Sequence, residues 1–259
     1  MKGDNDREFA DSERVYLGRT RSPENERLHV ERYRLAAAFV RQDHVVLDAA
    51  CGSGYGTQLL ADVAARVVGL DISAHAVDYA LQHYSRPNVD YRRADLESPI
   101  ALNDANFDVI VSFETLEHIS NQRRLLTEFH RLLKTGGLLI MSTPDRDVFQ
   151  QLAYQSAFHV HELSKLELTS LVGDHFKIVE LYGQVPYIPV GWHKVVRLLA
   201  SLDVFNLRSR LGKADGFLRK VRRAMVPIVV SEDGTNTVRI TLNGNEHSHV
   251  YLIVVASKL

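Results

Sequence analysis

The sequence VVLDAACGSGYGT, residues 45–57, decides the fold of this chain. Its apolar start, residues 45–47, lacks the alternation of a half-exposed strand, which indicates a central parallel strand covered on both faces. Asp48 ends that strand with a carboxylate. Three glycines follow at two-residue spacing, and glycine allows positive φ and close approach of a ligand: Gly52, Gly54 and Gly56. Helix formers resume at 57–65, so the loop would present N–H groups at a helix N-terminus.

A second apolar strand, residues 66–71, indicates which ligand lies against the loop. It ends in Asp71, nineteen residues after Gly52, where an acid can bind both hydroxyls of a ribose. A dinucleotide is disfavoured because the glycine spacing is not G-x-G-x-x-G and because Asp48 would repel a pyrophosphate. The pattern therefore predicts a nucleoside ligand with a cationic amino-acid end.

These segments resemble the cofactor motifs of the class I S-adenosylmethionine-dependent methyltransferases. Three further motifs follow in the family's order: RRADLES at 92–98 is similar to the adenine-binding turn, FDVIVSFETLEHI at 107–119 to the fourth strand and its exit loop, and LLKTGGLLIMSTP at 132–144 to a helix, glycine turn and fifth strand. The resemblance covers residues 44–185 well and the flanks poorly.

The resemblance implies S-adenosylmethionine as the cofactor. Asp48 and the glycine loop would hold its amino-acid end, Asp71 its ribose, and Asp95 with Leu96 its adenine. The remaining cofactor contacts that we expect come from the residues around these positions: Tyr16, Ala50, Cys51, Ile72, Phe113 and Glu114. Two of them have an alternative, since Cys51 also suits simple packing in the loop and Glu114 could cap the next helix.

We expect an α/β fold with a Rossmann-like, seven-stranded, mostly parallel sheet and helices on both faces. The expected strands are 44–49, 66–71, 89–94, 107–113, 137–143, 176–183 and 250–257, the last one antiparallel as the family implies. Ser22-Pro23-Glu24 predicts the start of a helix that reaches about Arg41, and 161–172 suits another helix.

Four regions are expected along the chain. They are an arm and cofactor-covering helix at 1–42, the core at 43–185, an insertion at 186–249 and the final strand at 250–259. The arm would be flexible unless a ligand orders it. Its residues that could face the pocket, or pack elsewhere, are Tyr16, Arg21, His29 and Tyr33.

The expected insertion differs in composition from the core. Between Pro186 and Pro227 nine Lys or Arg stand against two acids, beside an apolar stripe at helical spacing. This basic segment has three interpretations: a lid or homodimer face with solvated charges, recognition of a phosphate-bearing acceptor such as a nucleotide- or lipid-linked sugar, and peripheral docking on an anionic membrane through 192–225. Residues 235–242 alternate like a strand.

Three histidines are candidates for catalysis. His118 leaves the fourth strand and could act as general base, or could simply bond to backbone at a helix start. His159 and His161 follow the fifth strand and could reach the acceptor. The H-x-H pattern invites a metal, but no nearby acid or cysteine completes a ligand set in the sequence, so no metal is expected.

Composition limits the setting. The single cysteine excludes an internal disulfide, and the net charge of −1 gives no global field toward nucleic acid. No run of eighteen apolar residues and no apolar leader segment are present, so we expect a cytoplasmic protein, at the inner membrane surface if the basic segment docks there.

The sequence therefore predicts a methyltransferase for a small-molecule or glycan acceptor, with a hydroxyl of a sugar in polysaccharide or natural-product biosynthesis favoured. The ETLEH and FHVHELS segments are also similar to quinone-pathway O-methyltransferases. Nucleic acid is disfavoured because the fourth strand lacks an Asn/Asp-Pro-Pro-aromatic signature. A non-catalytic, cofactor-binding regulatory protein is the alternative.

Overall fold

The computed structural model describes residues 14–19, 23–151, 156–184, 237–241 and 249–259. The strands are β1 (Val45–Ala49), β2 (Arg66–Asp71), β3 (Val89–Arg93), β4 (Phe107–Phe113), β5 (Leu133–Pro144), β6 (Lys177–Gln184), β7 (Thr237–Arg239) and β8 (Tyr251–Ser257). The helices are α2 (Pro23–Ala37), α3 (Tyr55–Ala61), α4 (Ala74–His83), η1 (Leu116–His118), α5 (Gln122–Leu132), α6 (Arg146–Gln151) and α7 (Lys165–Gly173).

All described strands join one sheet in the order β3-β2-β1-β4-β5-β8-β6-β7. The five strands from β3 to β5 are mutually parallel, and β8 runs antiparallel between β5 and β6. The strand order reverses between β1 and β4, and ligands of open α/β sheets bind beyond the carboxyl ends of the strands at such a point. From this topology we expect the ligand site at the loops that follow β1, β2 and β4.

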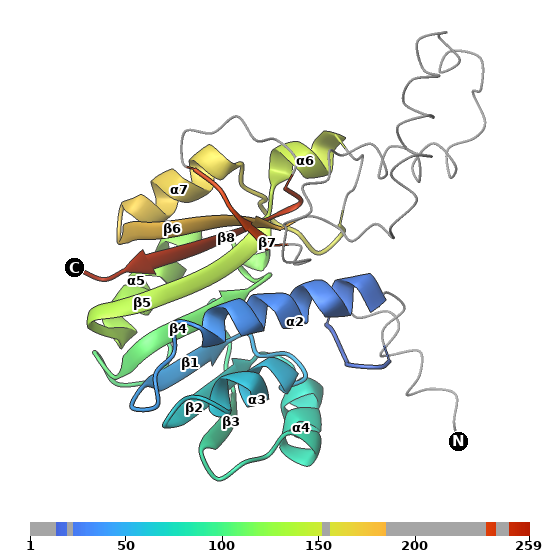
Figure 1. Cartoon of the computed structure of the whole chain (residues 1–259), viewed down its shortest axis with the longest axis vertical. Helices are drawn as coiled ribbons and strands as arrows, with labels where there is room; N and C mark the ends of the chain where they lie inside the picture. Colours follow the sequence, from blue (N-terminus) through green and yellow to red (C-terminus); the bar gives the residue numbers. More distant parts are fainter. Residues whose placement is uncertain (1–13, 20–22, 152–155, 185–236, 242–248) are drawn as a thin grey trace, which may run out of the picture.

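Helices cover both faces of the sheet, with α2 and α3 in front and α5 behind in Figure 1. The front core contains Tyr33 of α2 and Leu60 of α3, packed on Val46 of β1. The rear core contains Leu47 of β1 and the α5 residues Leu125, Leu126, Phe129 and Leu132, which recur at helical spacing. Each fully buried side chain of this kind contributes about 1.5–3 kcal/mol.

The seven expected strands are all present, and the expected antiparallel final strand is confirmed. The sheet has an eighth strand as well, because β7, within the segment that we expected to alternate, pairs with the edge of β6. Most of the expected insertion, residues 186–236 and 242–248, lies outside the described residues, and so does Arg21.

Helix boundaries were predicted less well than strands. The helix expected at 161–172 begins only at Lys165, because Ser164 caps it by accepting from the Glu167 amide while the Glu167 carboxylate accepts from the Ser164 amide. The helix expected at 57–65 is α3, which begins at Tyr55. The first helix ends at Ala37, before Arg41.

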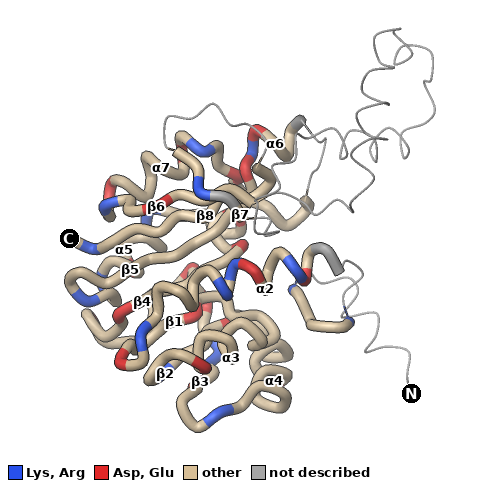
Figure 2. The backbone as a smooth tube through the Cα atoms, in the orientation of Figure 1, with Lys and Arg blue, Asp and Glu red and all other residues tan. Residues whose placement is uncertain are grey.

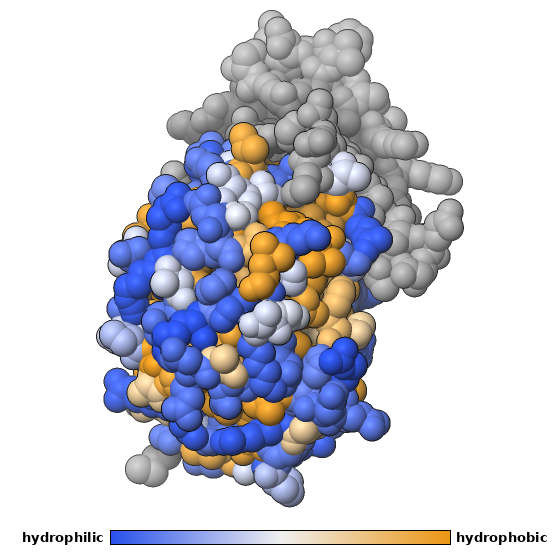
Figure 3. Space-filling view, turned by 90° about the vertical axis from the view of Figure 1, so that its left-hand side faces the viewer, coloured by the Kyte–Doolittle hydropathy of each residue, from blue (hydrophilic) through white to orange (hydrophobic). Residues whose placement is uncertain are grey.

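Charged residues of both signs are scattered over the described backbone (Figure 2). The end of the molecule where the parallel strands begin carries mostly hydrophilic side chains, with smaller apolar groups between them (Figure 3). In the described part of the chain no helix is long and apolar enough to cross a membrane.

Candidate functional site

The loop after β1 is shaped by three residues with positive φ. These are Ala50 (69°), Gly52 (55°) and Gly54 (91°). Ala50 takes a conformation that costs an L-residue about 1–2 kcal/mol, so the surrounding fold must hold it there. A Cβ on Gly54 would lie 2.6 Å from Cβ of Ala80, whereas a Cβ on Gly52 would meet nothing within 4 Å. The loop is thus packed on one side and open at Gly52.

Asp71, at the end of β2, is tied to this loop. Its Oδ2 accepts from the Gly52 amide at 2.9 Å, and its Oδ1 accepts from the Ser73 amide at 2.8 Å and from Nη2 of Arg14 at 3.0 Å. The side chain is 4% exposed. The carboxylate that we predicted to bind a ribose is therefore held in a fixed orientation beside the open side of the loop.

Asp48 lies beneath the loop and is fully buried. Its carboxylate accepts from the hydroxyl of Thr57 at 2.6 Å and from that of Tyr33 at 3.1 Å. Burial raises its pKa to about 7, although both hydroxyls favour the charged form. In this position Asp48 links α2 and α3 to β1, and its direct contact with a cofactor stays a prediction.

The described part of the leading arm, residues 14–19, is docked on the same region. The Ser53 hydroxyl donates to the carbonyl oxygen of Val15 at 2.7 Å, and Val15 and Tyr16 are both buried. The Tyr16 ring meets Tyr79 of α4 edge to face, with 4.9 Å between centroids. The arm therefore lies across the glycine loop and α4, and its role in covering a cofactor stays a prediction.

The residues expected to bind adenine lie after β2 and β3. Ile72 is 52% exposed although it is apolar, whereas Leu96 is buried. Asp95 is exposed, and its Oδ1 accepts from the Glu97 amide at 2.9 Å, which holds the turn. Cys51 packs against Val77, Ala80 and Tyr91, and burial raises the pKa of its thiol, so its place is that of a packing residue.

A half-buried ion pair lies directly after the end of β4. Phe113 packs edge to face on Tyr33, and Glu114 follows with a φ of 48°. Nη1 of Arg32, a fully buried residue of α2, lies 3.0 Å from Oε1 of Glu114. Nε of Arg32 donates to Oε1 of Gln184 at 2.7 Å, so this arginine joins α2 to β4 and β6.

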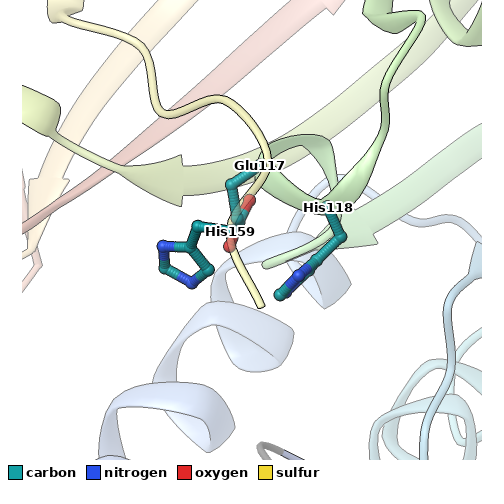
Figure 4. A group of neighbouring side chains, drawn as sticks. All are labelled: Glu117, His118 and His159. Atoms are coloured by element: carbon teal, nitrogen blue, oxygen red, sulfur yellow. The ribbon is translucent and has the colours of Figure 1, made fainter. Parts of the chain in front are cut away.

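Beyond Glu114, η1 and the loop before α7 bring three side chains together. Glu117, His118 and His159 each offer a ligand atom, and these atoms lie within 4.8 Å of one another. Figure 4 shows the two imidazoles on either side of the Glu117 carboxylate. His161 is exposed, and its amide, with that of Val160, donates to the carbonyl oxygen of Glu117.

This cluster corrects the expectation that no nearby acid completes a ligand set with the histidines. Glu117 was part of the ETLEH motif but was not weighed as a ligand, and only folding brings it to His159, which is 42 residues away in the sequence. Burial raises the pKa of Glu117, and the nearby Glu114 raises it further. Arg14 and Arg32 were also missed, since a lone arginine in an arm or helix carries no motif.

Part of the chain is similar to known proteins. Residues 47–141 match the model of a methyltransferase domain family. A probable S-adenosylmethionine-dependent methyltransferase of Mycolicibacterium smegmatis is 41% identical over 129 residues, which are 49% of this chain and 49% of that protein. A protein of the same description from Mycobacterium tuberculosis is 40% identical over 54% of this chain and 50% of its own length. The chain thus spans about half the length of these relatives.

The chain is also similar to a more distant relative and to two solved structures. The ubiquinone biosynthesis O-methyltransferase of Maricaulis maris is 34% identical over 39% of this chain and 41% of that protein. A methyltransferase solved in a complex with the Haloferax volcanii activator Trm112 has a TM-score of 0.63 at 19% identity, covering 91% of both chains. The N-methyltransferase NodS of Bradyrhizobium japonicum, solved with S-adenosyl-L-homocysteine, has a TM-score of 0.57 at 17% identity, covering 71% of this chain and 90% of that one. These two likenesses concern the fold alone.

Proposed function

We propose that the chain is a class I S-adenosylmethionine-dependent methyltransferase and that it transfers a methyl group from this cofactor to a hydroxyl of a small-molecule or glycan acceptor. One observation carries the proposal: the Gly52 loop after β1, Asp71 at the end of β2 and the His118 segment after β4 lie at the same edge of the sheet. That edge is where an open α/β sheet binds its ligands.

The residues at this edge suit an adenosyl group. The space beside Gly52 is open, Asp71 is oriented by two backbone amides, and Ile72 leaves an apolar side chain exposed next to it. Asp71 would accept from the ribose hydroxyls, while Ile72, Leu96 and Asp95 would contact the adenine. When bound, S-adenosylmethionine supplies an electrophilic methyl group on a positively charged sulfur.

The amino-acid end of the cofactor would lie between the glycine loop and the end of β4. Gly54, Gly56 and Ala50 shape the loop there, and Tyr16, Phe113 and Glu114 would close it. Glu114 keeps a fixed orientation because its Oε1 faces Arg32 at 3.0 Å and accepts from the Ser142 hydroxyl at 2.7 Å. Asp48 would act from beneath, through Thr57.

On the acceptor side, His118 is the group that we propose to take the hydroxyl proton. Its Nδ1 lies 3.0 Å from the carbonyl oxygen of Phe158, so a proton on Nδ1 is donated there and Nε2 carries the lone pair. As the acceptor oxygen bonds to the methyl carbon, its proton would pass to Nε2. General bases of this kind contribute about 10²–10⁴-fold in rate. His159 would line the same side, and His161 is the more peripheral of the pair.

Oxygen is favoured as the acceptor atom because the ubiquinone relatives are O-methyltransferases. A sugar hydroxyl in a polysaccharide or natural-product pathway is our first candidate, and a phenolic hydroxyl, as on a quinone precursor, is the second. The basic segment between Pro186 and Pro227 would suit a phosphate-bearing acceptor, for instance a nucleotide- or lipid-linked sugar.

The test is an assay with S-adenosylmethionine and panels of free sugars, nucleotide sugars, lipid-linked sugars and phenols, in which formation of S-adenosylhomocysteine is followed. Acceptor-dependent turnover that falls at least about 10²-fold in His118→Ala would support the proposal. Tight cofactor binding without turnover on any panel would instead favour a cofactor-binding regulatory protein.

A further inference from the structure

We propose that Glu117, His118 and His159 form a binding site for a divalent transition-metal ion at the acceptor side of the sheet edge. Their ligand atoms lie within 4.8 Å of one another. Around a zinc ion with ligands at about 2.0–2.2 Å, tetrahedral neighbours are about 3.3 Å apart. Small rotations of the two half-buried imidazoles therefore suffice to bring all three groups onto one ion.

Both imidazoles are oriented as metal ligands commonly are. Nδ1 of His118 lies 3.0 Å from the carbonyl oxygen of Phe158, and Nδ1 of His159 lies 2.5 Å from Oε1 of Glu162. An acceptor at Nδ1 fixes the tautomer that places the lone pair on Nε2, and it also fixes the orientation of the ring. Glu162 is thus the orienting partner of His159 rather than a ligand.

The backbone that carries these ligands is fastened together. The amides of Val160 and His161 donate to the carbonyl oxygen of Glu117 at 2.8 and 3.1 Å. Nε2 of Gln122 donates to the carbonyl oxygens of Leu116 and His161 at 2.8 and 2.9 Å. The loop with His159 is therefore held on η1, which carries Glu117 and His118. The site is built by the fold and does not depend on one mobile side chain.

The third ligand is fixed from β5. The Thr143 hydroxyl donates to Oε2 of Glu117 at 2.9 Å, so the other carboxylate oxygen is the one that can turn to the ion. Glu117 is 1% exposed, and a buried carboxylate is stabilised when a cation lies next to it. Two imidazoles and one carboxylate suit zinc, iron, cobalt or nickel better than magnesium or calcium, which prefer oxygen ligands alone.

Three protein ligands leave coordination positions for water or for an acceptor oxygen. The binding site stands on geometry alone, whereas its part in methyl transfer rests on the proposed function. There the ion would hold the acceptor hydroxyl and lower its pKa. With an ion bound, the lone pair of His118 is engaged, so His118 acts through the metal and is the proton acceptor itself only in the metal-free enzyme.

The test uses the full chain without a purification tag, stripped with a chelator and titrated calorimetrically with Zn²⁺. We expect one ion per chain and a higher melting temperature with Zn²⁺. His118→Ala, His159→Ala and Glu117→Gln should each weaken Zn²⁺ binding by at least about tenfold. The matched control is His161→Ala, which removes an imidazole from the same loop outside the cluster and should bind Zn²⁺ like the wild type. Co²⁺ should give visible absorption bands in the wild type and lose them in His159→Ala.

Absence of saturable Zn²⁺ binding would overturn the site, and so would unchanged affinity in the folded His118→Ala/His159→Ala variant, with folding checked by circular dichroism. S-adenosylhomocysteine binding, measured on the same stripped protein, separates this inference from the proposed function. Cofactor binding without Zn²⁺ binding refutes the metal site alone, and Zn²⁺ binding without cofactor binding refutes the methyltransferase proposal alone.

Discussion

Nη2 of Arg14 lies 3.0 Å from Oδ1 of Asp71, so the leading arm contacts the carboxylate that we assign to the ribose. The two partners differ in their surroundings: Arg14 is 35% exposed, whereas Asp71 is 4% exposed and also accepts from two backbone amides. The arm is held independently through Val15 and Ser53. Removing Arg14 and removing Asp71 should therefore change cofactor binding by different amounts.

Arg14→Ala should change the affinity for S-adenosylhomocysteine less than about fivefold, because a partly exposed ion pair contributes about 0–1 kcal/mol. Asp71→Ala should weaken that affinity far more, since it removes a ligand contact and two loop hydrogen bonds. Calorimetric titration of both variants checks this. Equal losses in the two variants would mean that Asp71 acts only by holding the arm.

The buried carboxyl of Asp48 predicts a pH dependence of stability. Its pKa is about 7 in the folded chain and near 4 when unfolded, so between these values the folded state binds more protons. The contribution of Asp48 to stability therefore falls as pH rises from about 4 to about 7 and is constant above. Asp48→Asn lacks this titration. The free energy of unfolding of the variant minus that of the wild type should therefore increase between about pH 5 and about pH 8. Denaturant titrations would contradict this if the difference did not change with pH.

Two loop glycines should respond differently to alanine. A Cβ on Gly56 would lie 2.1 Å from the Tyr33 ring, so Gly56→Ala must displace that buried ring and should lower the melting temperature clearly. A Cβ on Gly52 enters open space, and the cost is mainly the positive φ, about 1–2 kcal/mol. Gly52→Ala should thus keep the fold but weaken cofactor binding. Calorimetry and thermal melts of both variants measure the contrast, and a cofactor affinity unchanged in Gly52→Ala would place the ligand elsewhere.

The cap of α7 should be measurable. Ser164→Ala removes the hydroxyl that accepts from the Glu167 amide, and a lost cap costs about 0.5–2 kcal/mol. Thr169→Ala, on the exposed side of the same helix, should stay within about 0.5 kcal/mol of the wild type. Urea titrations of both variants test this, and equal effects would argue against the cap.

Strand positions were predictable because hydrophobic runs such as 107–113 are bounded by turns, and a parallel sheet allows few arrangements of them. The start of α7 was not predicted correctly, because the apolar spacing of FHVHELS is compatible with a helix that begins before Ser164. The signal that marks the true start is the Ser-x-x-Glu capping box formed by Ser164 and Glu167.

Some residues of the candidate site could likewise be predicted from the sequence, and others could not. Asp71 and the glycine loop carry local patterns, so they were found from the sequence. The proximity of Glu117 to His159 depends on backbone hydrogen bonds between η1 and a loop that lies beyond β5 and α6, and no sequence period encodes it. For the same reason no sequence period predicts that the buried Arg32 contacts Glu114, which follows β4, and Gln184 of β6.

The most direct test of the central claim is a calorimetric titration of the chain with S-adenosylhomocysteine, compared with Asp71→Ala and with Asp78→Ala, an exposed acid of α4, as the matched control. We predict one binding site in the wild type, an unchanged affinity in Asp78→Ala and a loss of about tenfold to hundredfold in Asp71→Ala, as for the removal of a hydrogen bond to a charged group. No binding to the folded wild type, or full affinity in Asp71→Ala, would contradict the account.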